Sequence, residues 1–173
     1  MSGVIDTSRL GTGNFPADAF PYLAPADSDR RKKTLHLTID SSLSDVSLVG
    51  LAVRGICAHT PLPREAHDEM EICVVEAVTN AICHAYHCKP GFTVEATIIL
   101  YDDRICFEIS EYGTAMDAFR PPTLEYDPSE TACLPEKGMG LFIISSIMDK
   151  VNYRSSNGRN TLSFCKYFSP ESC

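Results

Sequence analysis

The hydrophobic and polar positions change their period several times along the chain after residue 33. Residues 34–40, TLHLTID, alternate apolar and polar side chains, which predicts a half-buried strand. Apolar side chains then recur at helical spacing and predict a helix that begins near Ser41 and Ser42, whose hydroxyls can cap its first N–H groups. These apolar positions are Leu43, Val46, Val49, Val53 and Ile56. Two prolines within residues 59–65 end this helix.

The middle of the chain contains a longer helical pattern followed by two strand patterns. The helix is predicted from about Arg64 to His87. Residues 92–102 and 104–110 are rich in β-branched and aromatic side chains, and the acidic pair Asp102 and Asp103 lies where the two segments meet. This pattern predicts two strands joined by a tight turn.

The last third of the chain begins with a long irregular stretch. Residues 112–137 contain four prolines, and a loop of this length inside a compact domain is typical of a lid or a binding loop. A helix is predicted directly after Gly138 and Gly140, and the turn at residues 156–159 predicts a closing hairpin. The element order is therefore β-α-α-β-β-lid-α-β-β. It predicts an α/β (α+β) two-layer sandwich: a mixed, largely antiparallel sheet with helices on one face.

Composition and charge narrow the class of protein. The 173 residues are 44% hydrophobic, which predicts one globular domain over residues 34–173, preceded by a flexible extension over residues 1–33. A formal charge of -8 argues against a broad nucleic-acid surface. The chain contains no apolar run of about 18 residues, so no membrane span is predicted. Residues 1–15 have no signal-like pattern, so a cytoplasmic location is expected. The eight cysteines are interpreted as small buried hydrophobes or free surface thiols.

The candidate chemistry begins within residues 74–88, VVEAVTNAICHAYHC. At about 100° per residue, one face of this helix is apolar, and Glu76, Asn80 and His84 line up on the other. A carboxylate and an amide on successive turns suit phosphoryl transfer, the amide oxygen as a Mg²⁺ ligand and the carboxylate as a base. The alternative is an ordinary solvated polar face.

The same segment also contains a cluster of potential metal ligands. Cys83 and His87, like His84 and Cys88, are four residues apart. On a regular helix, however, the two pairs point about 100° apart, so a single ion cannot be bound by all four. A metal site is therefore not favoured.

Two further segments suit a nucleotide. In KGMGL, residues 137–141, the glycines let the backbone approach a ligand, and the following helix directs its N–H groups at an anion. In ISEYGTAMD, residues 109–117, Glu111 followed by Gly113 can accept a hydrogen bond from an exocyclic amine such as that of adenine.

Taken in this order, the three segments resemble the GHKL ATPase superfamily, and specifically the anti-sigma-factor serine/threonine kinases of bacteria. EAVTNAICHAY is similar to the family's N box, EYGTA to its D-x-G-x-G box, and KGMGLFIISSIMDKV to its second glycine box. The resemblance covers about residues 34–168. It implies a Bergerat-type fold that binds ATP with Mg²⁺ between the helices and an ATP lid.

The resemblance also implies roles for individual residues. Glu76 would be the catalytic residue, as the general base or positioning group for the attacking serine hydroxyl, and Asn80 the Mg²⁺ ligand. Glu111 would take the place of the adenine-reading Asp, and Thr161 would lie near the base. The implied cofactor-binding set is Asn80, His84, Glu111, Gly113, Met116, Lys137, Gly138, Met139, Gly140, Leu141 and Thr161.

The expected function is phosphorylation of a STAS-type anti-anti-sigma protein together with sequestration of a sigma factor, by a protein that forms a homodimer and binds neither nucleic acid nor membrane. Two positions depart from the family pattern: Glu111 replaces Asp, and Ala115 replaces the box's second glycine. They favour an alternative, a partner-binding switch with weak or absent catalysis. A histidine kinase is disfavoured because no helical segment with a phosphoacceptor His precedes residue 34.

Overall fold

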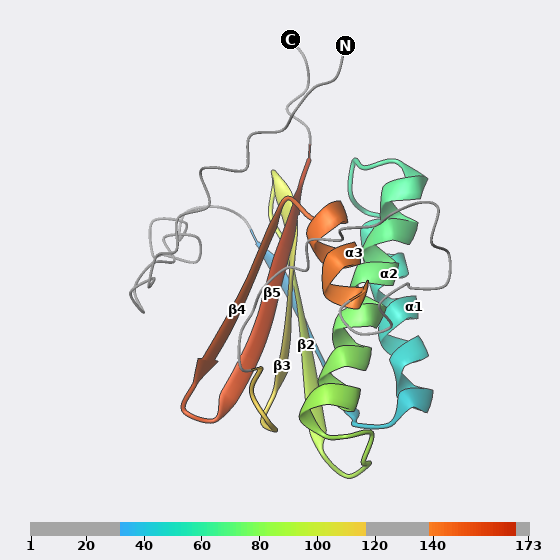
Figure 1. The fold of residues 1–173 in the computed structure, drawn as a ribbon. Helices are drawn as coiled ribbons and strands as arrows, with labels where there is room; N and C mark the ends of the chain where they lie inside the picture. Colours follow the sequence, from blue (N-terminus) through green and yellow to red (C-terminus); the bar gives the residue numbers. More distant parts are fainter. Residues whose placement is uncertain (1–31, 117–138, 169–173) are drawn as a thin grey trace, which may run out of the picture. The chain divides into compact units, whose positions relative to one another are not determined.

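The computed structural model describes residues 32–116 and 139–168 (Figure 1). Residues 1–31 of the predicted extension and residues 117–137 of the predicted lid lie outside this part. The described elements are β1 (Lys33–Asp40), the 3-10 helix η2 (Leu43–Asp45), α1 (Val46–Cys57), α2 (Arg64–Asn80), the π-helical turn η3 (Ala81–Ala85), β2 (Thr93–Leu100), β3 (Arg104–Glu111), α3 (Met139–Ile147), β4 (Lys150–Ser156) and β5 (Arg159–Tyr167). This order confirms the predicted succession of helices and strands.

The five strands form one sheet in the order β1-β2-β3-β5-β4, and all four pairings are antiparallel. The sheet was predicted to be mixed, but within the described residues it has no parallel pair. The closing hairpin β4–β5 turns at Asn157 and Gly158, which have left-handed φ values of 53° and 75°. Such a pair suits a two-residue hairpin turn. Because β5 pairs with β3, the last two strands are out of sequence order and β4 lies at one edge of the sheet.

The helices cover one face of the sheet (Figure 1). Alternate positions of β2, β3 and β5 point toward them, and the apolar positions of α1 and α2 point back. At the centre, Phe107 and Phe164 stack with ring centroids 5.5 Å apart. The predicted apolar faces of both long helices are confirmed at Val49, Val53, Val74, Val78 and Ile82, which belong to the buried core. Leu43 was predicted on the same face as Val49, but it lies in the 3-10 turn η2 and is exposed. No helix in residues 32–116 or 139–168 combines the length and the apolar character that crossing a membrane requires.

On the other face of the sheet, Cys106 and Cys165 form a disulfide. They are direct partners in the β3–β5 register. This corrects the interpretation of all eight cysteines as buried hydrophobes or free thiols. The positions of these two cysteines in separate strands could not indicate the pairing, because the strands are not consecutive in the chain.

Two helix ends differ from the prediction. Ser41 does not cap the first helix; its Oγ donates to the carbonyl of Lys89 (2.6 Å) and accepts from the N–H of Phe92 (3.0 Å), linking the end of β1 to the start of β2. The helix predicted to reach His87 ends at Ala85 in the η3 turn. His87 and the next residue have left-handed φ values, which reverse the chain toward β2.

Candidate active site

A cavity of about 550 Å³ lies between the helix layer and the end of the sheet. Its helix side comes from α2, η3 and α3, and its strand side from β3, β4, β5 and the chain that leaves β3. This volume is in the range of small-molecule sites. Five residues of the predicted set line it, namely Asn80, His84, Glu111, Met116 and Leu141. Ala77, Ile109 and Leu162 contribute apolar walls.

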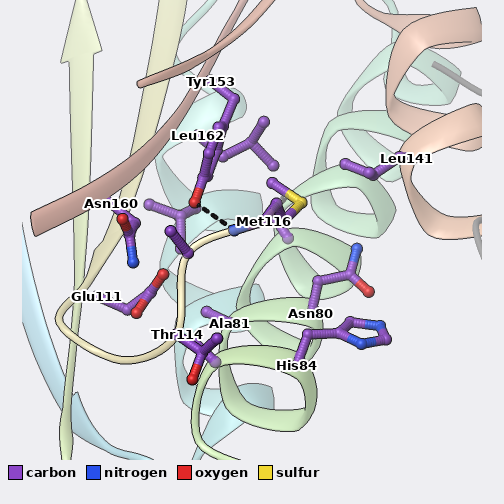
Figure 2. Close-up of a pocket in the computed structure, with 14 residues that line it drawn as sticks. Asn80, Ala81, His84, Glu111, Thr114, Met116, Leu141, Tyr153, Asn160 and Leu162 are labelled. Carbon is purple, nitrogen blue, oxygen red and sulfur yellow. Dashed lines mark hydrogen bonds between the residues drawn. The ribbon is translucent and has the colours of Figure 1, made fainter. Parts of the chain in front are cut away.

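At the strand side, Glu111 is the last residue of β3 and lies opposite Asn160 of β5 (Figure 2). Both side chains are buried, with 6% and 2% of their surface exposed. The Gly113 N–H donates to the Glu111 carboxylate, and the Asn160 amide donates to the Gly113 carbonyl at 3.2 Å. Burial raises the pKa of Glu111, while the hydrogen bonds from Gly113 and Asn160 act to lower it. The cavity therefore holds a buried acceptor that its neighbours keep in position.

Gly113 is required at this point by a close approach of two backbone segments. A β-carbon added there would collide with the carbonyl of Ala85 and would lie 2.9 Å from the ring of Tyr86. The next residue, Thr114, donates its N–H to the Ala85 carbonyl at 3.2 Å. Ala115 does not adopt a positive φ. The alanine in place of the family's second glycine therefore places no strain on the backbone.

At the helix side, Glu76 and Asn80 lie one turn apart on α2, against Gly140 in the first turn of α3. A β-carbon added to Gly140 would lie 2.6 Å from Oε2 of Glu76 and 2.9 Å from Nδ2 of Asn80. The glycine thus allows α3 to contact this polar pair directly. Asn80 lines the cavity, whereas Glu76 is half-buried beside it and is not part of the lining.

Two tyrosine hydroxyls also hold the chain that leaves β3. The Met116 N–H donates to the hydroxyl of Tyr153 at 2.9 Å (Figure 2). The Tyr112 N–H donates to the hydroxyl of Tyr86 at 2.8 Å. Burial raises the pKa of both tyrosines. These two bonds hold both ends of residues 112–116, the segment that carries Gly113 and contributes residues 114–116 to the cavity lining.

The other predicted positions fall in different places. His84 lines the cavity but is exposed, on the helix side with Asn80 (Figure 2). Thr161 was expected near the base, yet its hydroxyl is 2.9 Å from the hydroxyl of Ser110 and it does not line the cavity. Because side chains alternate along a strand and the neighbours of Thr161 on both sides line the cavity, Thr161 points to the opposite face of the sheet. Met139 begins α3 without lining the cavity. Lys137 and Gly138 lie outside the described residues.

Among the lining residues that the sequence analysis missed, Asn160 and Tyr153 are the two that hydrogen-bond to the chain leaving β3. Both lie in the closing hairpin, and their positions depend on its register against β3. Alternation along 159–167 marks one face of the strand, but only the pairing with β3 brings Asn160 to Glu111.

As for the cysteine and histidine cluster of residues 83–88, the described residues contain no group of three or more His, Cys, Asp or Glu arranged to hold a metal ion.

Comparison with known proteins agrees with this geometry. Residues 39–166 match the family model for the histidine kinase-like ATPase domain. Serine-protein kinase RsbW of Halalkalibacterium halodurans is 33% identical over 129 residues, which cover 73% of this chain and 78% of that protein. Serine-protein kinase RsbW of Staphylococcus epidermidis is 32% identical over 141 residues, 79% of this chain and 88% of that protein.

This chain belongs to the histidine kinase-like ATPase family, among the RsbW serine-protein kinases. It is thus a serine/threonine protein kinase that uses ATP. The fold agrees with the solved structure of the RsbU and RsbW domains of Rv1364c from Mycobacterium tuberculosis, with a TM-score of 0.56 and 15% identity. That match covers 80% of this chain and 33% of the other.

The residues of the kinase fit a magnesium nucleotide. The strand side of the cavity offers a buried acceptor, Glu111, between apolar walls, which suits the amine edge and the faces of a purine. The helix side offers the Asn80 amide oxygen, a ligand type that Mg²⁺ accepts, and Mg²⁺ commonly takes only one or two protein oxygens beside phosphates and water. The first turn of α3 adds N–H groups that have no partner within the helix.

Proposed function

We propose that this kinase transfers the γ-phosphoryl group of ATP to a serine of a STAS-type anti-anti-sigma protein, and that it also sequesters a sigma factor as a homodimer. The main support is the contact of Glu76 and Asn80 with Gly140 at the edge of the cavity. A carboxylate, an amide and the start of a helix meet there, and this combination suits the positioning and charge stabilisation on which phosphoryl transfer depends.

Each residue of this set has a distinct task. Mg-ATP supplies the transferable group and the charge neutralisation. Asn80 would coordinate the Mg²⁺ through its amide oxygen, and backbone N–H groups in the first turn of α3 would donate to phosphate oxygens. Glu76, half-buried and outside the cavity lining, stays available to orient the acceptor serine and take its proton.

The strand side would select and orient the nucleotide. Glu111 would accept a hydrogen bond from the adenine amine, and Asn160 would hold the surrounding backbone in place through the Gly113 carbonyl. The longer side chain of Glu111, compared with Asp, remains compatible with this task because its carboxylate is tied back to the Gly113 N–H.

The acceptor and the partners rest on the resemblance to anti-sigma-factor kinases, and a labelling experiment tests them. The kinase is incubated with Mg²⁺, labelled ATP and a purified STAS-type anti-anti-sigma protein from the same organism. We expect label on a single serine. Glu76→Gln should lower the rate by about 10²- to 10⁴-fold, the usual contribution of a general base, while ATP affinity is retained. Glu69→Gln, an exposed carboxylate on the same helix, is the matched control and should leave the rate unchanged.

The proposal fails if no serine is labelled, or if Glu76→Gln is as active as the wild type. Asn80→Ala should separately abolish Mg²⁺-dependent ATP binding in calorimetry.

Partner sequestration is measured by adding purified sigma factor and following the mass of the complex by light scattering. A complex of one dimer with sigma is expected, and a monomeric kinase that leaves sigma free would overturn this part.

The alternative, a binding switch without catalysis, rested on the two departures from the family pattern. The backbone of Ala115 is unstrained, and Glu111 lines the cavity as a buried acceptor. Neither departure therefore gives a structural reason for lost nucleotide binding. The switch would be favoured only if the protein binds Mg-ATP and its partners but labels no serine.

A further inference from the structure

Two free thiols lie close together at the end of η3, beside the nucleotide cavity. The Sγ atoms of Cys83 and Cys88 are 2.8 Å apart. A disulfide requires about 2.05 Å, so a small displacement would join them. Cys88 is exposed and Cys83 is half-buried, so the pair is open to solvent from one side.

The backbone brings the two sulfur atoms together. His87 and Cys88 have φ values of 55° and 58°, which fold the chain back over the π-helical turn. The Cys88 N–H donates to the Ile82 carbonyl at 3.0 Å, and the Lys89 N–H donates to the Tyr86 carbonyl at 3.0 Å. A left-handed φ is costly for residues other than glycine, and these hydrogen bonds hold the turn in that form. The proximity is therefore a property of the turn.

The two other free cysteines among the described residues are placed differently. Cys57 and Cys73 are fully buried in the core. Burial raises the pKa of each to about 12. Burial also raises the pKa of Cys83, to about 11. What distinguishes Cys57 and Cys73 is therefore that solvent and oxidant cannot reach them. They serve as internal controls for the exposed pair.

We propose that Cys83 and Cys88 are a modification site: a dithiol that a hydroperoxide oxidises to a reversible intrachain disulfide. In the first step, the exposed Cys88 sulfur attacks the peroxide, the O–O bond breaks, and Cys88 becomes a sulfenic acid with loss of water or an alcohol. In the second step, the Cys83 sulfur attacks the Cys88 sulfur, the S–O bond breaks, and water leaves. Two thiols are oxidised and one peroxide is reduced.

The site lies next to the nucleotide cavity. Ala85, between the two cysteines, lines the cavity, and its carbonyl accepts the N–H of Thr114 on the strand side. A cross-link would therefore restrain the turn on which the chain that leaves β3 rests. The chemistry itself needs neither ATP nor an acceptor protein, so its test is independent of the proposed kinase reaction.

The test uses the full chain with Cys133→Ser and Cys173→Ser, which removes the cysteines outside the described residues. The protein is treated with hydrogen peroxide, alkylated, denatured and digested with chymotrypsin without reductant. Tyr86 lies between the two cysteines, so cleavage after it converts the disulfide into a two-chain peptide that dithiothreitol separates. We expect this peptide from most chains, with Cys57 and Cys73 recovered as free thiols.

Two single variants test the order of the steps. In Cys83→Ser, Cys88 should accumulate as a sulfenic acid that dimedone captures. In Cys88→Ser, Cys83 should remain a free thiol at the same peroxide dose. Alkylation of both cysteines in the peroxide-treated parent protein would overturn the proposal, and so would a cross-link that joins either cysteine to another position. The parent protein needs no substitution at residues 83 or 88, so a folding defect in the variants leaves the test intact.

Discussion

The two ends of the nucleotide cavity are built in different ways. At the helix end, Glu76 and Asn80 follow from one regular helix, and a glycine of α3 contacts the ends of their side chains. At the strand end, the position of Glu111 depends on its cross-strand partner Asn160 and on the backbone at Gly113, which lies against the carbonyl of Ala85. A glycine is essential at both ends, but for different reasons.

The difference lies in what each glycine contacts. Gly140 lies against the flexible ends of the Glu76 and Asn80 side chains. These ends can move away from an added methyl group, but they then leave the positions that catalysis needs. Gly113 lies against the main chain of Ala85, which cannot move without disturbing η3. The same substitution should therefore reduce catalysis at one end and stability at the other.

Among the substitutions that compare the two ends, the largest effect is expected for Gly140→Ala. The added methyl group would displace Glu76 and Asn80, and an error of about 1 Å in a positioned catalytic group can cost about 10²-fold in rate. We expect kcat to fall by about that factor while the thermal midpoint changes little, because alanine also favours the helix. Phosphoryl-transfer kinetics and thermal unfolding measure the two quantities. Gly55→Ala in α1, where a β-carbon meets nothing within 4 Å, is the matched control and should keep full activity.

Gly113→Ala should show the reverse pattern, with a loss of about 1–3 kcal/mol in the free energy of unfolding, the usual cost of overpacking. The Thr114 N–H to Ala85 carbonyl bond would be broken or lengthened. Chemical denaturation with urea measures the loss. A variant as stable as Gly55→Ala would contradict the idea that the main chain of η3 is rigid at this point.

Asn160→Leu should weaken ATP binding by about tenfold. The substitution keeps the branched shape and the number of side-chain heavy atoms but leaves the Gly113 carbonyl without its amide donor, and an unpaired buried polar group costs about 1–3 kcal/mol. Isothermal calorimetry measures the dissociation constant. The adjacent Thr161→Val, on the opposite face of the sheet, is the control. Equal losses in the two variants would show that the assignment of faces is wrong.

The smallest effect concerns pH. Burial raises the pKa of Glu111 above its ordinary value of 4.5, and its ionised form is the better acceptor for an amine. Adenosine affinity should therefore fall as the pH is lowered through a midpoint above 4.5. In Asn160→Leu the midpoint should move to higher pH, because the amide that lowers this pKa is gone. Calorimetric titrations at several pH values measure both midpoints, and an unshifted midpoint would exclude Asn160 as the residue that positions Glu111.

The raised pKa of Glu111 affects stability in the opposite direction from nucleotide affinity. A carboxyl group whose pKa is higher in the folded state stabilises the protein when protonated, and this contribution is lost as the pH rises through the folded pKa. Near neutral pH, Glu111→Gln should therefore raise the thermal midpoint while it weakens nucleotide binding. Such a trade of stability for binding is common at functional sites.

Much of the helix end could be predicted from the sequence. Helical periodicity places Glu76, Asn80 and His84 on one face, and this holds through Asn80 because α2 is regular. The two faces persist into the π-helical turn, because His84 lines the cavity and Ile82 and Ala85 are buried. The helical pattern ends after Ala85, where His87 and Cys88 adopt left-handed φ values. The strand end could not be derived in the same way. Residue spacing along a strand identifies its two faces, but not which residue of a distant strand lies opposite.

By itself, the sequence determined the succession of helices and strands, the apolar face of each helix and the hairpin at Asn157 and Gly158. These follow from periods of 3.6 and 2 and from turn chemistry, which act over a few residues. Only the tertiary structure decided that Asn160 faces Glu111, that Thr161 faces away and that Cys106 pairs with Cys165. The physical reason is that the β3–β5 register depends on the packing of the whole core, which no local pattern contains.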